Sequence, residues 1–221
     1  MSFAALFAIL SVASLFAATP APTPATKDDA LLKVERFTLE NGMKFLFVKN
    51  PISPTVATFT QFKVGGVDER PGITGVAHIM EHMIFKGSKN LGTKNYAEEA
   101  PLLAKQDDLW RQIRAEGAKG GKADPAKIEA LEKEFEALTE RAREYVIEEE
   151  LWTLYLENGG DRLNASTGND TTQYYVNLPA NKLELYAWLE SDRFKEPIFR
   201  DFYPERQVVQ EERRMRYDTQ P

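Results

Sequence analysis

The chain has 221 residues, of which 43% are hydrophobic and 28% are charged, and its formal net charge is −6. This composition is typical of a globular protein with enough apolar material for a core, and the acidic balance argues against nucleic acid as a partner. The chain has no cysteine, which excludes disulfides, a thiolate nucleophile and cysteine ligands to a metal. Any metal site must therefore use histidine and carboxylate ligands.

Residues 3–18 form an uncharged apolar run that is short for a membrane span and suits the core of a signal peptide. Because no Lys or Arg precedes the run, an uncleaved anchor, a misplaced start codon and a core helix remain alternatives. The sequence T-P-A-P-T-P-A-T follows and predicts an extended linker. We therefore expect a signal peptide over 1–18, a linker over 19–31 and a folded domain over 32–221. We also expect a periplasmic or secreted location, with no stable membrane insertion after the signal peptide is cleaved.

Three strands are predicted before the first helix. Residues 34–40 and 43–49 flank Asn41-Gly42, which is a strong hairpin signal. Residues 55–64 are rich in β-branched and aromatic side chains and predict a third strand. The helix that follows contains G-V-A-H-I-M-E-H-M-I-F-K-G at 75–87, which includes both histidines of the chain.

The two histidines, His78 and His82, have the spacing of a metal site. Four residues span about 400° of an α-helix, so the imidazoles lie on one face one turn apart and can share one metal ion. Glu81 lies on the neighbouring strip of the helix, within reach of a water on that metal. The pattern His-x-x-Glu-His is the inverse of the zinc-peptidase motif His-Glu-x-x-His. The alternatives are a histidine pair satisfied within the core and a capping or salt-bridge role for Glu81.

Residues 98–160 predict a hairpin of two long, charged helices, over 98–116 and 125–158, joined by a turn at 117–124. A narrow apolar stripe gives this hairpin coiled-coil character. It is either a solvated helical spur or a docking element for a partner or substrate. Two strands are expected at 163–167 and 171–178, a helix begins at Asn181, and a last helix begins at Pro204.

The third metal ligand has to be a carboxylate, since a catalytic zinc site usually has three protein ligands. In the last helix Glu205 and Glu212 are separated by about 700° and flank the apolar face, whereas Glu211 points toward solvent. Carboxylates on the buried side of a helix need a compensating positive charge. We therefore predict that Glu212 is the metal ligand. We predict that Glu205 contacts and orients a ligand without binding the metal itself. The alternatives are salt bridges to arginines of the same helix, or a helix that exposes every glutamate.

Four motifs, taken in this order, resemble the pitrilysin/insulinase family of inverzincin metallopeptidases, and especially its processing-peptidase-like subfamily. They are H-I-M-E-H-M-I-F-K-G-S at 78–88, L-N-A-S-T-G at 163–168, T-Q-Y-Y at 172–175 and E-R-Q-V-V-Q-E-E at 205–212. The resemblance implies zinc ligands at His78, His82 and Glu212. It also implies that Glu81 is the general base and that Glu205 assists.

The resemblance further implies a substrate-binding role for Asn164, Ala165 and Ser166 on an edge strand that pairs with an extended substrate. From the residues alone, Asn164 is better interpreted as a turn residue. The implied activity is that of a zinc endopeptidase domain that hydrolyses peptides or unfolded polypeptide segments. It would hold one Zn²⁺ per catalytic domain, with a zinc-bound water activated by Glu81.

The expected fold is α+β, a two-layer sandwich of a mainly antiparallel mixed sheet with helices on one face, plus an inserted long helical hairpin over 98–160. Family members have at least two similar domains that close a chamber, so we expect a C-terminal companion domain or subunit outside this chain and no activity from the isolated domain. The alternatives are a non-catalytic member that serves as a structural or assembly partner, and a binding module in which the helical spur recruits a partner and the zinc is structural.

Overall fold

The computed structural model describes residues 33–215. The predicted signal peptide at 1–18 and the predicted linker at 19–31 lie outside the described residues, as do residues 216–221. The chain forms two compact units, one up to Pro51 and one from Ile52 onward. Within residues 33–215, no helix combines the length and the apolar character that a membrane span requires.

The first unit contains an antiparallel hairpin of β1 (Val34–Thr38) and β2 (Lys44–Val48). Gly42 at the turn has a φ of 87°, a conformation that glycine adopts at little cost. Across the two strands Phe37 pairs with Phe45, and their rings stack 4.6 Å apart. The hairpin predicted from Asn41-Gly42 is thus present.

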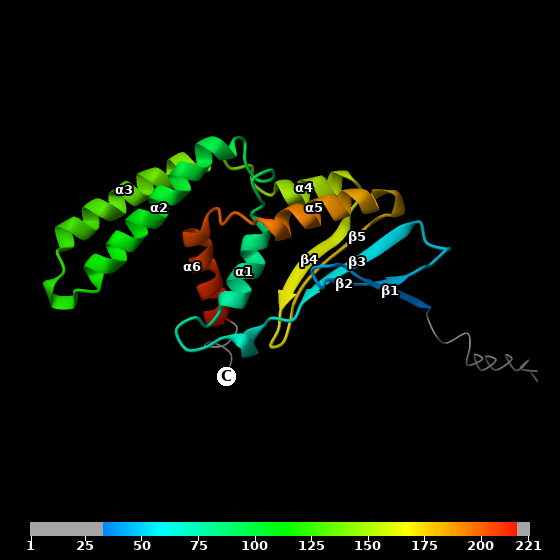
Figure 1. Ribbon diagram of the computed structural model, residues 1–221. Coiled ribbons are helices and arrows are strands. Elements are labelled where there is room, and N and C mark those ends of the chain that lie inside the picture. The colour runs from blue at the N-terminus through cyan, green and yellow to red at the C-terminus, as the bar shows by residue number, and fades with distance from the viewer. Residues whose placement is uncertain (1–32, 216–221) are drawn as a thin grey trace, which may run out of the picture. The chain divides into compact units, whose positions relative to one another are not determined.

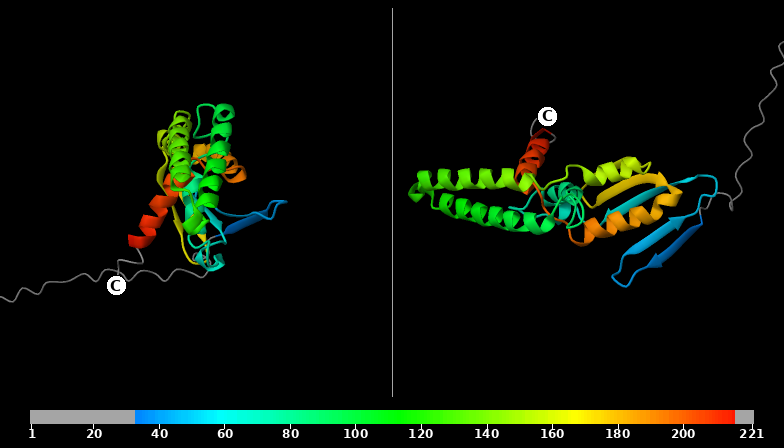
Figure 2. Two further views of the ribbon diagram at one scale, coloured as in Figure 1. Left: turned by 90° about the vertical axis from the view of Figure 1, so that its left-hand side faces the viewer. Right: turned by 90° about the horizontal axis from the view of Figure 1, so that it is seen from above.

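The second unit is built on a three-stranded antiparallel sheet in the order β3-β5-β4. Its strands are β3 (Thr55–Phe62), β4 (Asp161–Thr167) and β5 (Thr172–Pro179). The helices α4 (Glu150–Glu157) and α5 (Leu183–Lys195) lie on one face of this sheet (Figures 1 and 2). The α+β class with helices on one face is therefore confirmed, and both described sheets are antiparallel throughout.

The main core lies between this sheet and its two helices. On β5 every second side chain is buried, as expected for a strand with one covered face. Leu151 and Tyr155 of α4 and Leu189 of α5 pack against Val176 and Leu178 of β5. The alternation thus shows that one face of β5 is covered, while its two edges pair with β3 and β4.

Two further helices lie side by side next to the sheet, α1 (Val76–Phe85) and α6 (Phe202–Arg213) (Figure 1). Ile79 and Met83 of α1 form a small apolar cluster with Val209 of α6, against which Phe202 packs. α1 also contacts β4 and β5. This packing brings the histidine helix, the glutamate helix and the sheet to one place.

The predicted helical hairpin is formed by α2 (Tyr96–Gly117) and α3 (Pro125–Arg143), which lie side by side along their length (Figure 2). Asp124 caps α3 through hydrogen bonds from the backbone of residues 126 and 127, and Pro125 occupies the first turn. Short 3-10 helices occur at Gly66–Asp68, Gly120–Lys122 and Ala180–Lys182.

The second helix of this hairpin is shorter than predicted, because it ends at Arg143 and not near residue 158. Residues 145–147 leave the helix and pair with residues 92–94 through two backbone hydrogen bonds and a β-bridge. Glu149 then adopts a φ of 52° immediately before α4 begins. The prediction of one continuous helix was wrong because this pairing partner is far away in the sequence.

A buried arginine fixes the loop that joins α1 to α2. Arg200 is 1% exposed, and its guanidinium donates to the backbone carbonyls of Lys86, Ser88 and Leu91 at 2.5–3.0 Å. It also forms a 2.6 Å ion pair with the fully buried Glu99 of α2. A single side chain thus connects the end of α1, the start of α2 and the segment that leads into α6.

Candidate metal centre

The two histidines converge on one point beside α1. His78 and His82 are one helical turn apart, and their Nε2 atoms lie 3.2 Å from each other. The ring planes are nearly perpendicular, at 80°, and both side chains are about one-fifth exposed. The nitrogens are therefore reachable from solvent while their rings are held by the surrounding helices.

Glu212 reaches the same point from α6. Its Oε2 lies 3.6 Å from Nε2 of His78, and one ligand atom from each of the three residues lies within 4.8 Å of the others. Tetrahedral zinc with ligands at roughly 2.0–2.1 Å separates them by about 3.3 Å. The observed nitrogen and oxygen positions fit one zinc ion with small side-chain adjustments.

Glu205 lies behind the histidines and contacts the other nitrogen of His82. Its Oε1 is 2.8 Å from Nδ1 of His82, and its Oε2 is 2.8 Å from Nζ of Lys86. Burial raises the pKa of the Glu205 carboxyl, but the hydrogen bonds from Lys86 and His82 outweigh this and lower the pKa below its ordinary value. When Nδ1 donates to this carboxylate, Nε2 of His82 is left with a lone pair for a metal.

Glu81 is 9% exposed and points toward the edge strand of the sheet. Its Oε2 accepts a hydrogen bond of 2.5 Å from Oγ1 of Thr167, the last residue of β4. Oγ1 of Thr172 on β5 is 3.4 Å from the same hydroxyl. The sheet thus holds the Glu81 carboxylate at the end of β4.

The predicted substrate residues lie on β4, which pairs with β5 on one side and has no strand on the other side within residues 33–215. Asn164 and Ser166 are exposed and lie on one face of the sheet, whereas Ala165 lies on the helix-covered face with Leu163. Asn164 Oδ1 accepts a hydrogen bond from the backbone N–H of Ala165 at 2.8 Å. Asn164 therefore lies within a strand and not in a turn.

Sequence reasoning missed two residues of this centre, Lys86 and Thr167. A signal was present for Lys86, since it follows His82 by four residues and thus lies on the same helix face. Thr167 alternates with Ala165 on β4 and shares its helix-covered face. Its contact with Glu81 spans 86 positions of sequence, so no local pattern indicates it.

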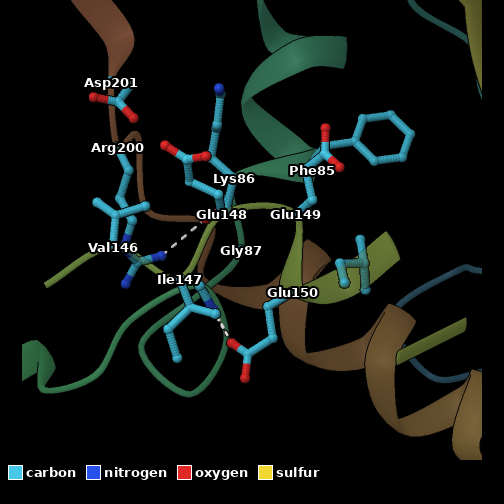
Figure 3. A pocket seen from close by; sticks show the side chains of 12 residues that line it. Phe85, Lys86, Gly87, Val146, Ile147, Glu148, Glu149, Glu150, Arg200 and Asp201 are labelled. Carbon is cyan, nitrogen blue, oxygen red and sulfur yellow. Dashed lines mark hydrogen bonds between the residues drawn. The ribbon is translucent and has the colours of Figure 1, made fainter. Parts of the chain in front are cut away.

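A cavity of about 180 Å³ lies between the end of α1 and the segment that joins α3 to α4 (Figure 3). Lys86, Arg200 and an acidic run at 148–150 line it, but His78, His82 and Glu212 do not. Arg200 and Glu150 are both hydrogen-bonded to backbone groups of the wall. The three candidate metal ligands thus lie outside the lining of this cavity.

Comparison with known proteins places this geometry in a family. The family model described as Insulinase (Peptidase family M16) matches residues 44–106. The zinc protease PqqE of Helicobacter pylori is 30% identical over 199 residues, which is 86% of this chain and 31% of that protein. The chain belongs to the insulinase family of peptidases. It is thereby similar to proteins that are named as zinc proteases.

Other insulinase-family relatives agree with this assignment. The crystal structure of a protease from Helicobacter pylori superimposes with a TM-score of 0.58 and 26% sequence identity, covering 86% of this chain and 33% of that one. An uncharacterized zinc protease of Rickettsia bellii is 44% identical over 61 residues, which is 28% of this chain and 15% of that protein. The chain thus spans about a third or less of the length of these relatives.

Proposed function

We propose that this chain is the zinc-binding domain of an endopeptidase that hydrolyses peptide bonds in peptides or unfolded polypeptide segments. The observation that carries the proposal is the convergence of two imidazole nitrogens from α1 and a carboxylate from α6 on one point. Glu81 lies on the same helix as the histidines. Nitrogen and carboxylate oxygen donors are the ligands that zinc uses when no cysteine is present. The names of the relatives, zinc proteases, support the same metal.

His78, His82 and Glu212 would hold one Zn²⁺ per domain and leave a coordination position open, as catalytic sites do. When bound, zinc supplies a Lewis acid that polarises the peptide carbonyl and makes a neighbouring water a better nucleophile at neutral pH. Glu205 holds the His82 ring in the tautomer that presents Nε2. The negative charge of Glu205 also makes that ring a better donor.

Glu81 is the general base of the proposed reaction. Its carboxylate takes a proton from the attacking water and later delivers that proton to the leaving amine. The hydrogen bond from Thr167 fixes the orientation of the carboxylate, and the side chain has little contact with bulk water. A positioned carboxylate of this kind contributes roughly 10²–10⁴-fold to the rate.

The substrate is proposed to pair with the edge of β4, where Asn164, Ala165 and Ser166 would contact it. An extended peptide that adds to an open sheet edge gains main-chain hydrogen bonds without regard to its sequence. Thr167, which follows on the same strand, touches Glu81. A peptide laid along this edge is thereby led toward the base and the metal ligands.

The proposal includes a partner and a location. Because the chain covers about a third of the Helicobacter pylori relatives, we propose that a second family-type domain or subunit closes a chamber over the site. The isolated domain would then have little activity. The apolar run at 3–18 supports a signal peptide and a periplasmic or secreted location, with no stable membrane insertion after cleavage.

The test is the Glu81→Gln variant of the intact gene product, assayed on an unstructured peptide. Zinc content should stay at one ion per site because Glu81 is not a ligand, while turnover should fall by about 10²–10⁴-fold. The matched control is Glu132→Gln, which removes the charge of an exposed glutamate on α3. Undiminished turnover by Glu81→Gln would remove Glu81 as the base.

A further inference from the structure

The helix that carries Glu205 and Glu212, α6, packs against both helices of the helical hairpin. Trp110 of α2, Phe135 of α3 and Tyr203 of α6 form an aromatic cluster. The Tyr203 ring centroid lies 5.0 Å from that of Trp110 and 5.0 Å from that of Phe135, the latter edge-to-face at 89°. These separations are typical of favourable ring pairs.

Two further contacts join α6 to α2. The Tyr203 hydroxyl donates a 2.7 Å hydrogen bond to Oδ1 of Asp107 on α2. The guanidinium of Arg206 on α6 lies 4.6 Å from the centroid of the Trp110 ring, in cation–π range. The hairpin therefore contacts two side chains of α6 that are three residues apart and lie on one face of the helix.

The opposite face of α6 contacts α1 through Val209, Phe202 and Glu205. Val209 is the one side chain of α6 that is buried within the described residues, and it packs against Ile79 and Met83. Glu205 and Glu212 flank Val209 at helical spacing, so they face α1 while Tyr203 faces the hairpin. Contacts with α1 hold one face of α6 and the hairpin contacts hold another, so both sets limit the rotation of α6 about its axis.

That rotation decides the geometry of the centre. His78 and His82 belong to one helix, so their Nε2 separation is set by α1 itself. Glu212 is the ligand candidate that comes from a different helix, and its distance from His78 changes with any roll of α6. Binding sites of this kind need their side chains within about 0.5 Å and 10–20° of the productive geometry.

We propose that the helical hairpin is a buttress for the metal centre, in which Trp110 and Phe135 are positioning residues for Glu212 and Glu205. Trp110 and Phe135 pack against the Tyr203 ring and thereby fix the orientation of α6, the helix that also carries Glu205 and Glu212. This inference rests on the proposed zinc site. It gives the hairpin a role within the domain, in addition to any contact that it makes with solvent or with another molecule.

The test compares zinc affinity in the 221-residue chain and in its Trp110→Ala and Phe135→Ala variants, by competition with a chelator. Each variant should bind zinc about tenfold more weakly, which is the range seen when a residue that orients a metal ligand is replaced. Their Co²⁺ forms should show altered absorption bands, which report the ligand geometry. Trp110→Phe, which keeps an aromatic ring, should recover most of the affinity.

The matched control is Ile113→Ala, which removes a buried apolar side chain from α2, the helix of Trp110. It should lower the stability to unfolding but leave zinc affinity and the Co²⁺ spectrum unchanged. Unchanged affinity in Trp110→Ala and Phe135→Ala, or an equal loss in Ile113→Ala, would overturn the inference.

A second readout separates this inference from the proposed function. In the metal-free chain, backbone amides of α6 should exchange hydrogen faster in Trp110→Ala than in Ile113→Ala. If the unaltered chain binds no zinc, the proposed function fails and the role of the buttress in metal binding fails with it. If zinc binds but α6 exchange and affinity are the same in all variants, only the buttress fails.

Discussion

At His82 the two ring nitrogens have different partners, and this difference carries much of the site's chemistry. Nε2 faces Nε2 of His78, and Nδ1 faces the carboxylate of Glu205. Lys86 holds the second oxygen of the same carboxylate. The positive side chain keeps Glu205 ionised, and ionised Glu205 fixes the proton of His82 on Nδ1. A chain of charge-assisted hydrogen bonds thus orients one proposed ligand.

Replacement of Glu205 tests this chain of contacts. Glu205→Ala should weaken zinc binding by about 10–100-fold, because the His82 ring loses the group that fixes its tautomer and orientation. Glu205→Gln should lose less, since the amide oxygen still accepts from Nδ1. The measurement is a chelator competition with each variant, and zinc affinity equal to that of the unaltered chain would show that Glu205 does not support the site.

At the scale of single residues, helical periodicity in the sequence predicts part of this arrangement. The four-residue spacing of His78 and His82 predicts that their rings meet, and the seven-residue spacing of Glu205 and Glu212 predicts a shared helix face. The contact of Thr167 with Glu81 could not be predicted. It depends on the pairing of β4 with β5 and on the packing of α1 against both, which no local pattern specifies.

At the scale of elements, the tip of the helical hairpin has its own charge cluster. The Glu116 side chain is 4% exposed and accepts hydrogen bonds from the ammonium groups of Lys119 and Lys127 and from the backbone N–H of Asp124. The bonds from Lys119 and Lys127 and that from Asp124 lower the pKa of Glu116 from 4.5 to about 2. Ionised Glu116 therefore stabilises the turn between α2 and α3.

This lowered pKa predicts a pH dependence of stability. An acid whose pKa is lower in the folded chain contributes stability that is complete above its unfolded pKa and is lost as the pH falls through the folded one. Glu116 therefore stabilises the fold above about pH 4.5, and its contribution declines toward pH 2. Glu116→Gln should have lower stability at neutral pH and a shallower decline between these two values.

The measurement is urea unfolding of the chain and of Glu116→Gln at a series of pH values between 2 and 7. Glu132→Gln, at an exposed position of α3, is the control and should follow the unaltered chain. If the free energy of unfolding changes with pH in the same way for Glu116→Gln and the unaltered chain, ionisation of Glu116 does not contribute to stability.

The elements show where sequence patterns are sufficient. Asn41-Gly42 predicts the first hairpin because the turn itself requires those residue types. Asp124-Pro125 marks the start of α3 for the same reason, a local cap. The end of α3 at Arg143 was missed because residues 145–147 leave the helix for a partner at 92–94. Helix-favouring composition continues through that break.

At the scale of the whole molecule, the centre depends on three separate parts of the second unit. The sheet holds Glu81 through Thr167, α1 supplies the histidines, and α6 supplies Glu205 and Glu212. The α+β class and the one-sided helix layer could be predicted from the order of strands and helices. The packing of the hairpin against α6 could not be predicted, because Trp110, Phe135 and Tyr203 are far apart in the sequence and meet only in the folded chain.

The central claim is that His78, His82 and Glu212 together hold one zinc ion, and direct titration of the 221-residue chain with Zn²⁺ tests it. The chain should bind one zinc, and His78→Ala and Glu212→Ala should lose this binding. Glu211→Ala should bind like the unaltered chain, since Glu211 forms an exposed ion pair with Arg214 and lies off the site. Full zinc binding by Glu212→Ala, or its loss in Glu211→Ala, would contradict the account.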